Sequence, residues 1–298
     1  MSEKYALINA EKADPQSPYP TDGMCRWLSV SRSGFYEWRT ATPSAAARRR
    51  VLLAGLVAAA FEAGRGTYGA RRIRAVLGNG GHPVSLRLVR RLMREQGLRA
   101  CQPRAYRTTT RPDPTAPART DHLGRDFTAT APGVKLVGDI TFIRTWEGWL
   151  YLATVIDCYS RRVVGWSMAE HMRTPLICAA LDMAATNTAL SPGCVFHSDR
   201  GSQYTSAEHY RHSTDLGVTL SAGATGVCWD NALAESFFAA LKNELVYRTV
   251  FSTRKKARRA IAEYIEVFYN RQRLHSTLGY QTPAAVEASY RQSSTKAA

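Results

Sequence analysis

The chain lacks the cysteine patterns that cross-link small secreted domains or bind zinc. Its 298 residues include six cysteines, scattered along the sequence without a CxxC pair. This spacing argues against a disulfide framework and a zinc knuckle, and it predicts reduced thiols. The longest apolar run, residues 51–61, is internal and too short to cross a bilayer. We therefore expect neither a transmembrane helix nor a signal peptide, and we predict a cytoplasmic protein.

Acidic residues are also few. The chain has 24 Asp and Glu against 40 Lys and Arg, and a formal net charge of +16. Residues 1–120 hold 21 basic and 8 acidic side chains, residues 121–250 hold 10 and 13, and residues 251–298 hold 9 and 3. Such a pattern is expected if basic ends bind a nucleic-acid backbone while the middle gathers carboxylates for a metal. A basic solvated surface on an ordinary enzyme is the alternative.

The N-terminal third has helical patterns. Residues 24–39, MCRWLSVSRSGFYEWR, predict a short helix, a serine-rich turn and a second helix that starts near Ser33. This is the outline of a helix-turn-helix, with a purely structural helical hairpin as the alternative. Residues 45–64 predict a longer helix. We therefore predict a helical, helix-turn-helix-like DNA-binding region over residues 1–106.

Two arginine-rich amphipathic helices are expected at residues 65–78 and 84–98. In the second, apolar residues recur at helical spacing on one face, and the arginines lie on the others. A solvated arginine face is the alternative to DNA contact, and nothing in the pattern indicates which base would be read. The arginines that we predict to contact DNA are Arg71, Arg72, Arg87, Arg90, Arg91 and Arg94.

The remaining two thirds predict an α/β domain after a linker. Residues 107–132 are rich in Thr, Pro and Ala and lack apolar periodicity, so they predict the linker. Residues 133–250 then predict three antiparallel strands followed by helix, strand, helix, strand and helix. This order is typical of a ribonuclease H-like core. Residues 251–298 predict a basic helical extension, whose apolar stripe would pack either on the core or on a partner subunit.

Three acidic residues in this core predict a metal site. Asp139 lies in a strand between apolar neighbours, Asp199 follows a short apolar strand, and Glu235 is near the start of a helix. A solitary carboxylate among apolar residues is costly unless it is paired or bound to metal. Carboxylate oxygens are the hard ligands that Mg²⁺ prefers. Taken singly, each has a structural alternative: a salt bridge, a turn cap or a helix-dipole partner.

A lysine follows on the helix that carries Glu235. At 100° per residue, Glu235 and Lys242 lie together on the side opposite the apolar residues. We expect Lys242 to contact a substrate phosphate, with a simple solvated lysine as the alternative. Glu244 falls near the apolar side and has no explanation unless it pairs with an arginine of the C-terminal helix.

Other polar residues compete for these roles. Asp157 ends the second strand and Asp230 precedes the last helix of the core, and both rank below the three acids as ligands. His209 and His212 form an HxxH pattern without a third ligand nearby, so we predict an exposed polar face there. His197 shares a strand face with Asp199 and would support the site without being a ligand.

Ordered motifs give the chain a family resemblance. The strings GDIT, YLATVIDCYSRRVVGW, HSDRGSQYTS, DNALAESFFAALKNE and YNRQRLHSTLGYQTP occur in that order. They resemble the second-reading-frame (OrfB-type) products of IS-three family insertion-sequence transposases, relatives of the retroviral integrases. The resemblance covers essentially the whole chain, because SVSRSGFYEW, YGARRI and RLMREQGL also resemble the family's N-terminal region. It implies a DDE integrase core with catalytic acids at Asp139, Asp199 and Glu235, and a basic catalytic residue at Lys242.

The resemblance implies a DNA transposase, a polynucleotidyl transferase that cleaves and joins strands at insertion-sequence ends. Two Mg²⁺ ions, with Mn²⁺ as a substitute, would be bound by Asp139 between them and by Asp199 and Glu235 at one ion each. The implied partners are double-stranded DNA, namely terminal inverted repeats and target, further copies of the chain in a synaptic complex, and an upstream-frame product or fusion. The implied location is the bacterial cytoplasm, at the nucleoid when bound to DNA.

Two other functions are left open by the residues: a nuclease of the same fold that does not join strands, and a non-catalytic DNA-binding regulator. The chain also departs from the family pattern. Its loop SAGATGVCWDN has Ala224 and Thr225 where SMSRKGNCWDN has an arginine and a lysine, which calls a DNA contact by this loop into question. The His and Cys pairs that bind zinc in retroviral integrases are absent.

Overall fold

The computed structural model describes residues 2–101, 126–222 and 231–297. The chain forms two compact units, Met1–Leu56 and Val57–Ala298. The predicted boundary after residue 106 and most of the predicted linker lie outside the described residues. The predicted domain limits therefore stay predictions.

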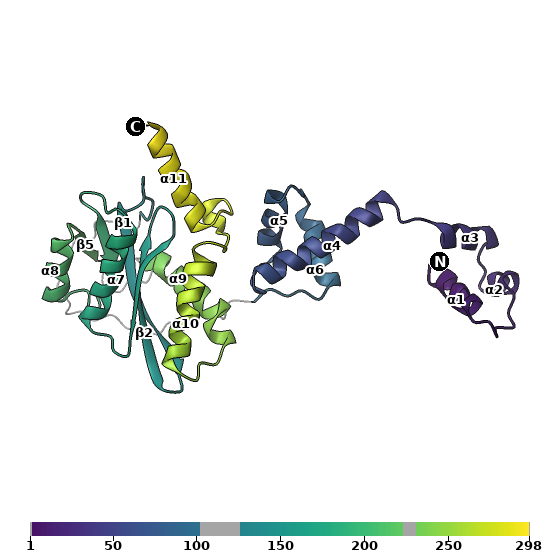
Figure 1. The fold of residues 1–298 in the computed structure, drawn as a ribbon, viewed down its shortest axis with the longest axis horizontal. Coiled ribbons are helices and arrows are strands. Elements are labelled where there is room, and N and C mark those ends of the chain that lie inside the picture. Colours follow the sequence, from purple (N-terminus) through teal and green to yellow (C-terminus); the bar gives the residue numbers. More distant parts are fainter. Residues whose placement is uncertain (1, 102–125, 223–230, 298) are drawn as a thin grey trace. The chain divides into compact units, whose positions relative to one another are not determined.

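The first unit contains three short helices around a small apolar core (Figure 1). These are α1 (Ser2–Ala13), α2 (Thr21–Trp27) and α3 (Arg32–Thr40). Helix α3 begins where it does because the Ser31 hydroxyl caps it, accepting a hydrogen bond from the Gly34 amide at 3.3 Å. The core residues are Tyr5, Ile8, Met24, Cys25 and Phe35. The helix, turn and helix predicted in residues 24–39 are thus confirmed.

The arginine-rich helices are also present. Helix α4 (Ala45–Ala63) includes the point at which the two units divide, and α5 (Ala70–Asn79) and α6 (Leu86–Glu95) follow it. In α6 the apolar residues at helical spacing are buried or half-buried, as predicted. Of the six arginines predicted to contact DNA, only Arg72 is half-buried, and Arg71, Arg87, Arg90, Arg91 and Arg94 are exposed. Their DNA contacts stay predictions.

A mixed five-stranded sheet forms the centre of the second unit. Its strands are β1 (Lys135–Thr145), β2 (Gly148–Asp157), β3 (Val163–Ala169), β4 (Val195–Ser198) and β5 (Thr219–Ala222). The order is β3-β2-β1-β4-β5, with β1, β2 and β3 antiparallel and β4 and β5 parallel to β1. This is the strand arrangement of a ribonuclease H-like fold, which confirms the predicted fold class.

Helices cover both faces of the sheet (Figure 1). On one side lie α7 (Thr174–Asn187) and α8 (Ala207–Asp215), and on the other lie α9 (Ala232–Glu244) and α10 (Arg254–Glu263). The backbone of α7 lies very close to Gly165 of β3: a Cβ added at Gly165 would lie only 2.1 Å from the Ala180 carbonyl oxygen. Only glycine permits this approach, so the α7 side of the sheet is a closed core.

The C-terminal residues pack on this chain's own core. After the short helix η2 (Val246–Arg248), α10 runs into the π-helical turn η3 (Tyr264–Tyr269), and η4 (Ser276–Leu278) and α11 (Pro283–Ala297) end the chain. The predicted apolar stripe, Ile261, Ile265 and Phe268, is fully buried. The Asn270 side chain then exchanges two 3.0 Å hydrogen bonds with the Val163 backbone of β3. Of the two packing alternatives, the structure selects the core.

Glu244 has the arginine partner that the sequence left open. Its carboxylate accepts hydrogen bonds from the Arg273 Nη2 and Nε at 2.7 and 2.9 Å, and from the Tyr264 hydroxyl at 2.8 Å. Both charged side chains are almost entirely buried. The pair therefore joins the end of α9 to the segment after η3.

The structure also bears on the predicted absences. Within residues 2–101, 126–222 and 231–297, no helix is both long and apolar enough to cross a membrane. The five cysteines in these ranges are free thiols, as predicted.

We predict that Arg273→Met destabilises the second unit by about 3 kcal/mol, because it leaves the Glu244 carboxylate buried without its main partner. Urea unfolding would measure this change. Glu95→Gln is the matched control: it removes an exposed pair with Arg91 on α6 and should change stability by about 0.5 kcal/mol or less. Equal losses in the two variants would contradict the importance of the buried pair.

Candidate active site

The sheet geometry decides where Asp139 points. Leu136 and Ile140 pack against the core on the α7 side. Because side chains alternate along a strand, Asp139 lies on the other face of β1. Its carboxylate accepts a 2.7 Å hydrogen bond from the Ile140 amide and is half-buried. The central strand thus holds a carboxylate away from the closed core.

Strand register places Asp199 beside Asp139. β1 and β4 run parallel, with Val137 opposite His197. Asp139 and Asp199 each lie two residues further along than this pair. Asp199, just past the end of β4, is therefore beside Asp139 and on the same face of the sheet. The Asp199 Oδ1 accepts the Gly201 amide at 3.0 Å, which fixes the turn after β4. This is the carboxyl end of a parallel strand, where open α/β sheets place ligands.

Helix α9 brings the other two residues. The Asn231 side chain donates a 3.1 Å hydrogen bond to the Gly138 carbonyl oxygen and so anchors the start of α9 next to Asp139. The apolar side of the helix is buried and Glu235, in its first turn, is exposed. Lys242 lies two turns further on, with its Nζ 5.5 Å from the centre of the Phe142 ring on β1.

His197 supports the site from below, as predicted. It is buried, and its Nδ1 lies 2.9 Å from the Ser221 hydroxyl on β5. The pair links β4 to β5 directly beneath the turn that carries Asp199. This hydrogen bond leaves His197 in a supporting position, not among the candidate ligands.

The electrostatics show that the four charged side chains share one region. Burial, followed by the negative charge of Asp199 and then that of Glu235, raises the pKa of Asp139 to about 8, against the Ile140 hydrogen bond and Lys242. Partial desolvation also raises the pKa values of Asp199 and Glu235. Burial lowers the pKa of Lys242, and the Asp139 charge opposes this shift. The structure therefore brings all four predicted residues together.

The three carboxylates are chemically suited to bind a divalent cation. Three hard carboxylates converge with too little positive charge to balance them, and the resulting repulsion is what a bound cation relieves. In the part of the chain that the structure describes, no three His, Cys, Asp or Glu side chains are already closed around a common point. Coordination of one ion by all three acids therefore requires side-chain adjustment, and both Asp199 and Glu235 are exposed to solvent.

Asp157 has a structural role instead of a ligand role. Its Oδ1 accepts the Gly133 amide at 2.9 Å, and its Oδ2 accepts the Ser160 amide and hydroxyl at 2.7 and 2.6 Å. The residue is fully buried, so it fixes the turn after β2. Asp230, the other rival, lies outside the described residues, as do Ala224 and Thr225.

The predicted exposed face at His209 and His212 is wrong. His209 is fully buried, with its ring centre 5.7 Å from those of Phe196 and Tyr204. His212 forms a 2.8 Å contact with Asp182 of α7. The reason is that this side of α8 packs toward the sheet, so the two histidines face different surroundings and do not form a metal-binding pair.

Two supporting residues were not found from the sequence. Asn231 is the N-cap residue of α9, but its side chain makes no cap hydrogen bond and reaches across to β1 instead. Phe142, beneath Lys242, stands in the strand with its ring about half exposed. An exposed aromatic residue three positions after Asp139 was the only signal available for it.

Comparison with known proteins agrees with this geometry. Residues 129–228 match an integrase core domain family, residues 216–283 match a second integrase core domain family, and residues 47–106 match an HTH-like domain. Transposase InsF for insertion sequence IS3A of Escherichia coli K12 is 38% identical over 286 residues, which cover 95% of this chain and 98% of that protein. The chain belongs to the IS3 family of insertion-sequence transposases.

Other relatives of this transposase include an uncharacterized 31 kDa protein of insertion element IS600 from Shigella sonnei. It is 39% identical over 90% of this chain and 99% of its own length. Among solved structures, the HTLV-2 integrase catalytic core domain in complex with magnesium (dimeric form) aligns with 53% of this chain and 98% of that chain. The TM-score is 0.44 and the identity 17%.

Family membership makes the chain a DNA transposase, an enzyme of the polynucleotidyl transferase class. The HTH-like match begins in α4 and includes α5 and α6. It therefore lies later in the transposase than the helix-turn-helix outline predicted at residues 24–39.

We predict that Asp139→Asn stabilises the metal-free transposase at alkaline pH. The folded-state pKa of Asp139, about 8, exceeds the ordinary value of 3.8, so the folded state binds this proton more tightly than the unfolded state. Wild-type stability is therefore lost as pH rises from about 4 to about 8, and the variant escapes this loss. In EDTA, the melting temperature of the variant should exceed that of the wild type by an amount that grows from pH 6 to pH 8, by several degrees for about 2 kcal/mol.

Asp215→Asn, an exposed carboxylate on α8, is the control and should show no such trend. Mg²⁺ should raise the melting temperature of the wild type and of this control, but not that of Asp139→Asn. A stability difference between Asp139→Asn and the wild type that does not depend on pH would contradict the crowding of the carboxylates.

Proposed function

We propose that this transposase cuts and joins DNA strands at a site formed by Asp139, Asp199 and Glu235, which hold Mg²⁺. The observation that carries the proposal is the placement of the three carboxylates on β1, at the end of β4 and on α9, where burial and the charges of Asp199 and Glu235 raise the pKa of Asp139. When bound, Mg²⁺ supplies a Lewis acid that stabilises the charge on the reacting phosphate and activates the attacking hydroxyl.

The protein's own groups then position the reactants. The Ile140 and Gly201 amides orient the Asp139 and Asp199 carboxylates through their hydrogen bonds. Lys242 contributes a positive charge beside the carboxylates, suited to a non-reacting oxygen of the same phosphate. Catalysis then consists of positioning and charge stabilisation.

No side chain of the site is suited to act as a nucleophile. The Ser198 hydroxyl donates a 3.0 Å hydrogen bond to the Asp199 carbonyl oxygen, and it is not paired with a general base. Nucleophilic serines require an adjacent base that is oriented by a third group. The attacking groups are therefore water in cleavage and a DNA 3′-hydroxyl in joining.

The DNA partners follow from the charge distribution. The N-terminal 120 residues and the C-terminal 48 are strongly basic, and five of the six predicted arginines are exposed. We infer binding to the terminal inverted repeats and to target DNA, largely through backbone phosphates. Because two element ends must meet, the working form is a homo-oligomer, with an upstream-frame product or fusion as a further partner.

The central test uses Asp199→Asn. A labelled duplex that carries the element's end is incubated with the full chain in Mg²⁺, and nicked and joined strands are separated. We expect the variant to lose at least about 100-fold in both products and to bind the duplex as the wild type does. Asp215→Asn should retain activity. Joined products from Asp199→Asn at the wild-type level would contradict the proposed ligand.

The wild-type products also separate the rival functions. Nicked strands without joined strands would indicate a nuclease, and DNA binding without any product would indicate a regulator.

The variant Lys242→Gln tests whether Lys242 contacts the substrate phosphate without taking part in metal binding. Because the lysine is not a ligand, Mg²⁺ should raise the melting temperature of the variant as much as that of the wild type. Strand joining should fall about tenfold or more, because the developing charge loses one stabilising contact. Loss of the Mg²⁺ effect would show that Lys242 maintains the metal site instead of contacting substrate.

A further inference from the structure

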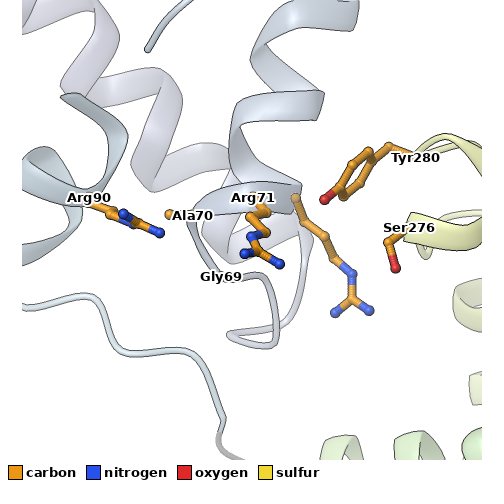
Figure 2. Close-up of a pocket in the computed structure, with 7 residues that line it drawn as sticks. Gly69, Ala70, Arg71, Arg90, Ser276 and Tyr280 are labelled. Carbon is orange, nitrogen blue, oxygen red and sulfur yellow. The ribbon is translucent and has the colours of Figure 1, made fainter. Parts of the chain in front are cut away.

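A cationic pocket lies between the start of α5 and the loop around η4 (Figure 2). Its volume is about 360 Å³, far above the ~15 Å³ that one water needs. Figure 2 shows Arg90 on one side, Tyr280 and Ser276 on the other, and Arg71 between them. The lining contains three arginines and no acidic side chain. The two walls come from segments about 200 residues apart in the sequence.

The positive charge of the pocket is not balanced from within the protein. Among the described residues, none forms an ion pair with Arg71 or Arg90, and both side chains are exposed. Arg72 donates through Nε to the Leu274 carbonyl oxygen at 3.0 Å, and its Nη1 is 3.9 Å from Glu244. That carboxylate is already bonded to Arg273, so it offsets little of the pocket's charge.

The surroundings carry the same sign. Burial and the positive charges of Arg273, Arg72 and Arg161 lower the pKa of His275, at the base of the loop, to about 3. His275 is therefore neutral at physiological pH. The region as a whole favours an anion.

The pocket also offers uncharged hydrogen-bond donors. Gly69 is the N-cap of α5 and has no side chain that could cap the first amides of this ten-residue helix. Gly69 and Ala70, where the helix begins, both line the pocket. Helix N-termini favour anions through these amides and the helix dipole. Ser276 and Tyr280 place hydroxyl groups on the opposite wall. Arginine forks, amides and hydroxyls together match the oxygens of a phosphate group.

The loop that carries Tyr280 is held in a demanding conformation. Gly279 and Tyr280 have φ values of 62° and 61°, and a tyrosine in this left-handed region is strained. The Tyr280 amide donates to the His275 carbonyl oxygen at 2.8 Å, and His275 pairs with Gln281 as an isolated bridge. These bonds close the loop and keep the tyrosine ring at the pocket.

The two walls are also tied to each other. The Tyr68 hydroxyl, just before α5, donates to the Gln272 carbonyl oxygen at 2.8 Å and accepts the Leu274 amide at 2.9 Å. Tyr68 is buried. The start of α5 and the base of the loop are therefore fastened together, and the pocket is a built feature of the second unit.

We propose that this pocket binds one backbone phosphate of the DNA, so that a single strand is gripped by α5, α6 and the C-terminal loop together. The inference rests on the proposed function, because it takes DNA to be the substrate. Beyond that function, the proposal names the pocket at which the arginine-rich helices and the loop around η4 would contact the same phosphate. The lining offers arginine and hydroxyl donors and no acidic group, which suits the oxygens of a backbone phosphate, a contact that positions the strand without reading its sequence.

The experiment measures binding of the full chain to the end duplex in EDTA, so that no strand is cut. Single phosphates are replaced in turn by neutral methylphosphonates. We expect one position, or a short run, at which the replacement weakens wild-type binding about tenfold or more. The double variant Arg71→Gln, Arg90→Gln should bind more weakly and should lose its sensitivity at that position.

Two further variants sharpen the test. Arg74→Gln removes one arginine charge from the exposed surface of α5, where the side chain does not line the pocket, and it should keep the wild-type methylphosphonate pattern. Tyr280→Phe removes a hydroxyl without changing charge, and it should weaken binding and reduce sensitivity at the same phosphate. The double variant should also lower the slope of log K against log salt concentration by about 1.

Three results would overturn the proposal. The double variant would bind like Arg74→Gln, or it would keep its sensitivity at the same phosphate, or inorganic phosphate would compete at the pocket while no methylphosphonate position responded. The last result would indicate a site for free anions. Binding in EDTA is independent of cleavage, so a chain that shows the expected phosphate contact but makes no products in Mg²⁺ contradicts only the catalytic assignment.

Discussion

The central constraint on this structure is the free-energy cost of placing a charged carboxylate on the central strand of a packed sheet. Asp139 stands on β1 between two covered faces, and its neighbours Asp199 and Glu235 add to the cost, which appears as a pKa of about 8. The nearby packing lets this arrangement form. The Asn231 side chain donates a hydrogen bond to the Gly138 carbonyl oxygen and so holds α9 against β1. The positive charge of Lys242 partly offsets the negative charge of the carboxylates. A group of carboxylates with little positive charge nearby is suited to a divalent cation, as the proposed Mg²⁺ chemistry needs.

The C-terminal residues complete this core and extend it toward the arginine-rich helices. Asn270 pairs with the backbone of β3, and Arg273 neutralises Glu244 at the end of α9. Directly beyond Arg273, the Leu274 backbone is hydrogen-bonded to Tyr68, just before α5, and to Arg72 within α5. One short stretch therefore connects the sheet, the helix that carries Glu235 and the helices that carry the exposed arginines.

Much of this could be predicted from local patterns, and the remainder depends on tertiary contacts. Runs of β-branched and aromatic residues between turn residues located all five strands, and the spacing of Asp139, Asp199 and Glu235 on strands and helix indicated a shared site. Family motifs supported the same residues. The bonds of Asp157 to Ser160 are local, but its bond to Gly133 was not predictable, because Gly133 lies 24 residues away in the sequence. The burial of His209 depends on how α8 packs, and the pocket depends on segments 200 residues apart meeting across Tyr68.

The most direct test of the account is to locate the ions themselves. Crystals of the full chain with end duplex and Mn²⁺ in place of Mg²⁺ would give anomalous peaks at any bound ion. The account predicts that the anomalous peaks lie at the carboxylates of Asp139, Asp199 and Glu235, which would hold the ions. Peaks elsewhere, or full occupancy in crystals of Asp139→Asn, would contradict the claim that these three acids form the catalytic site.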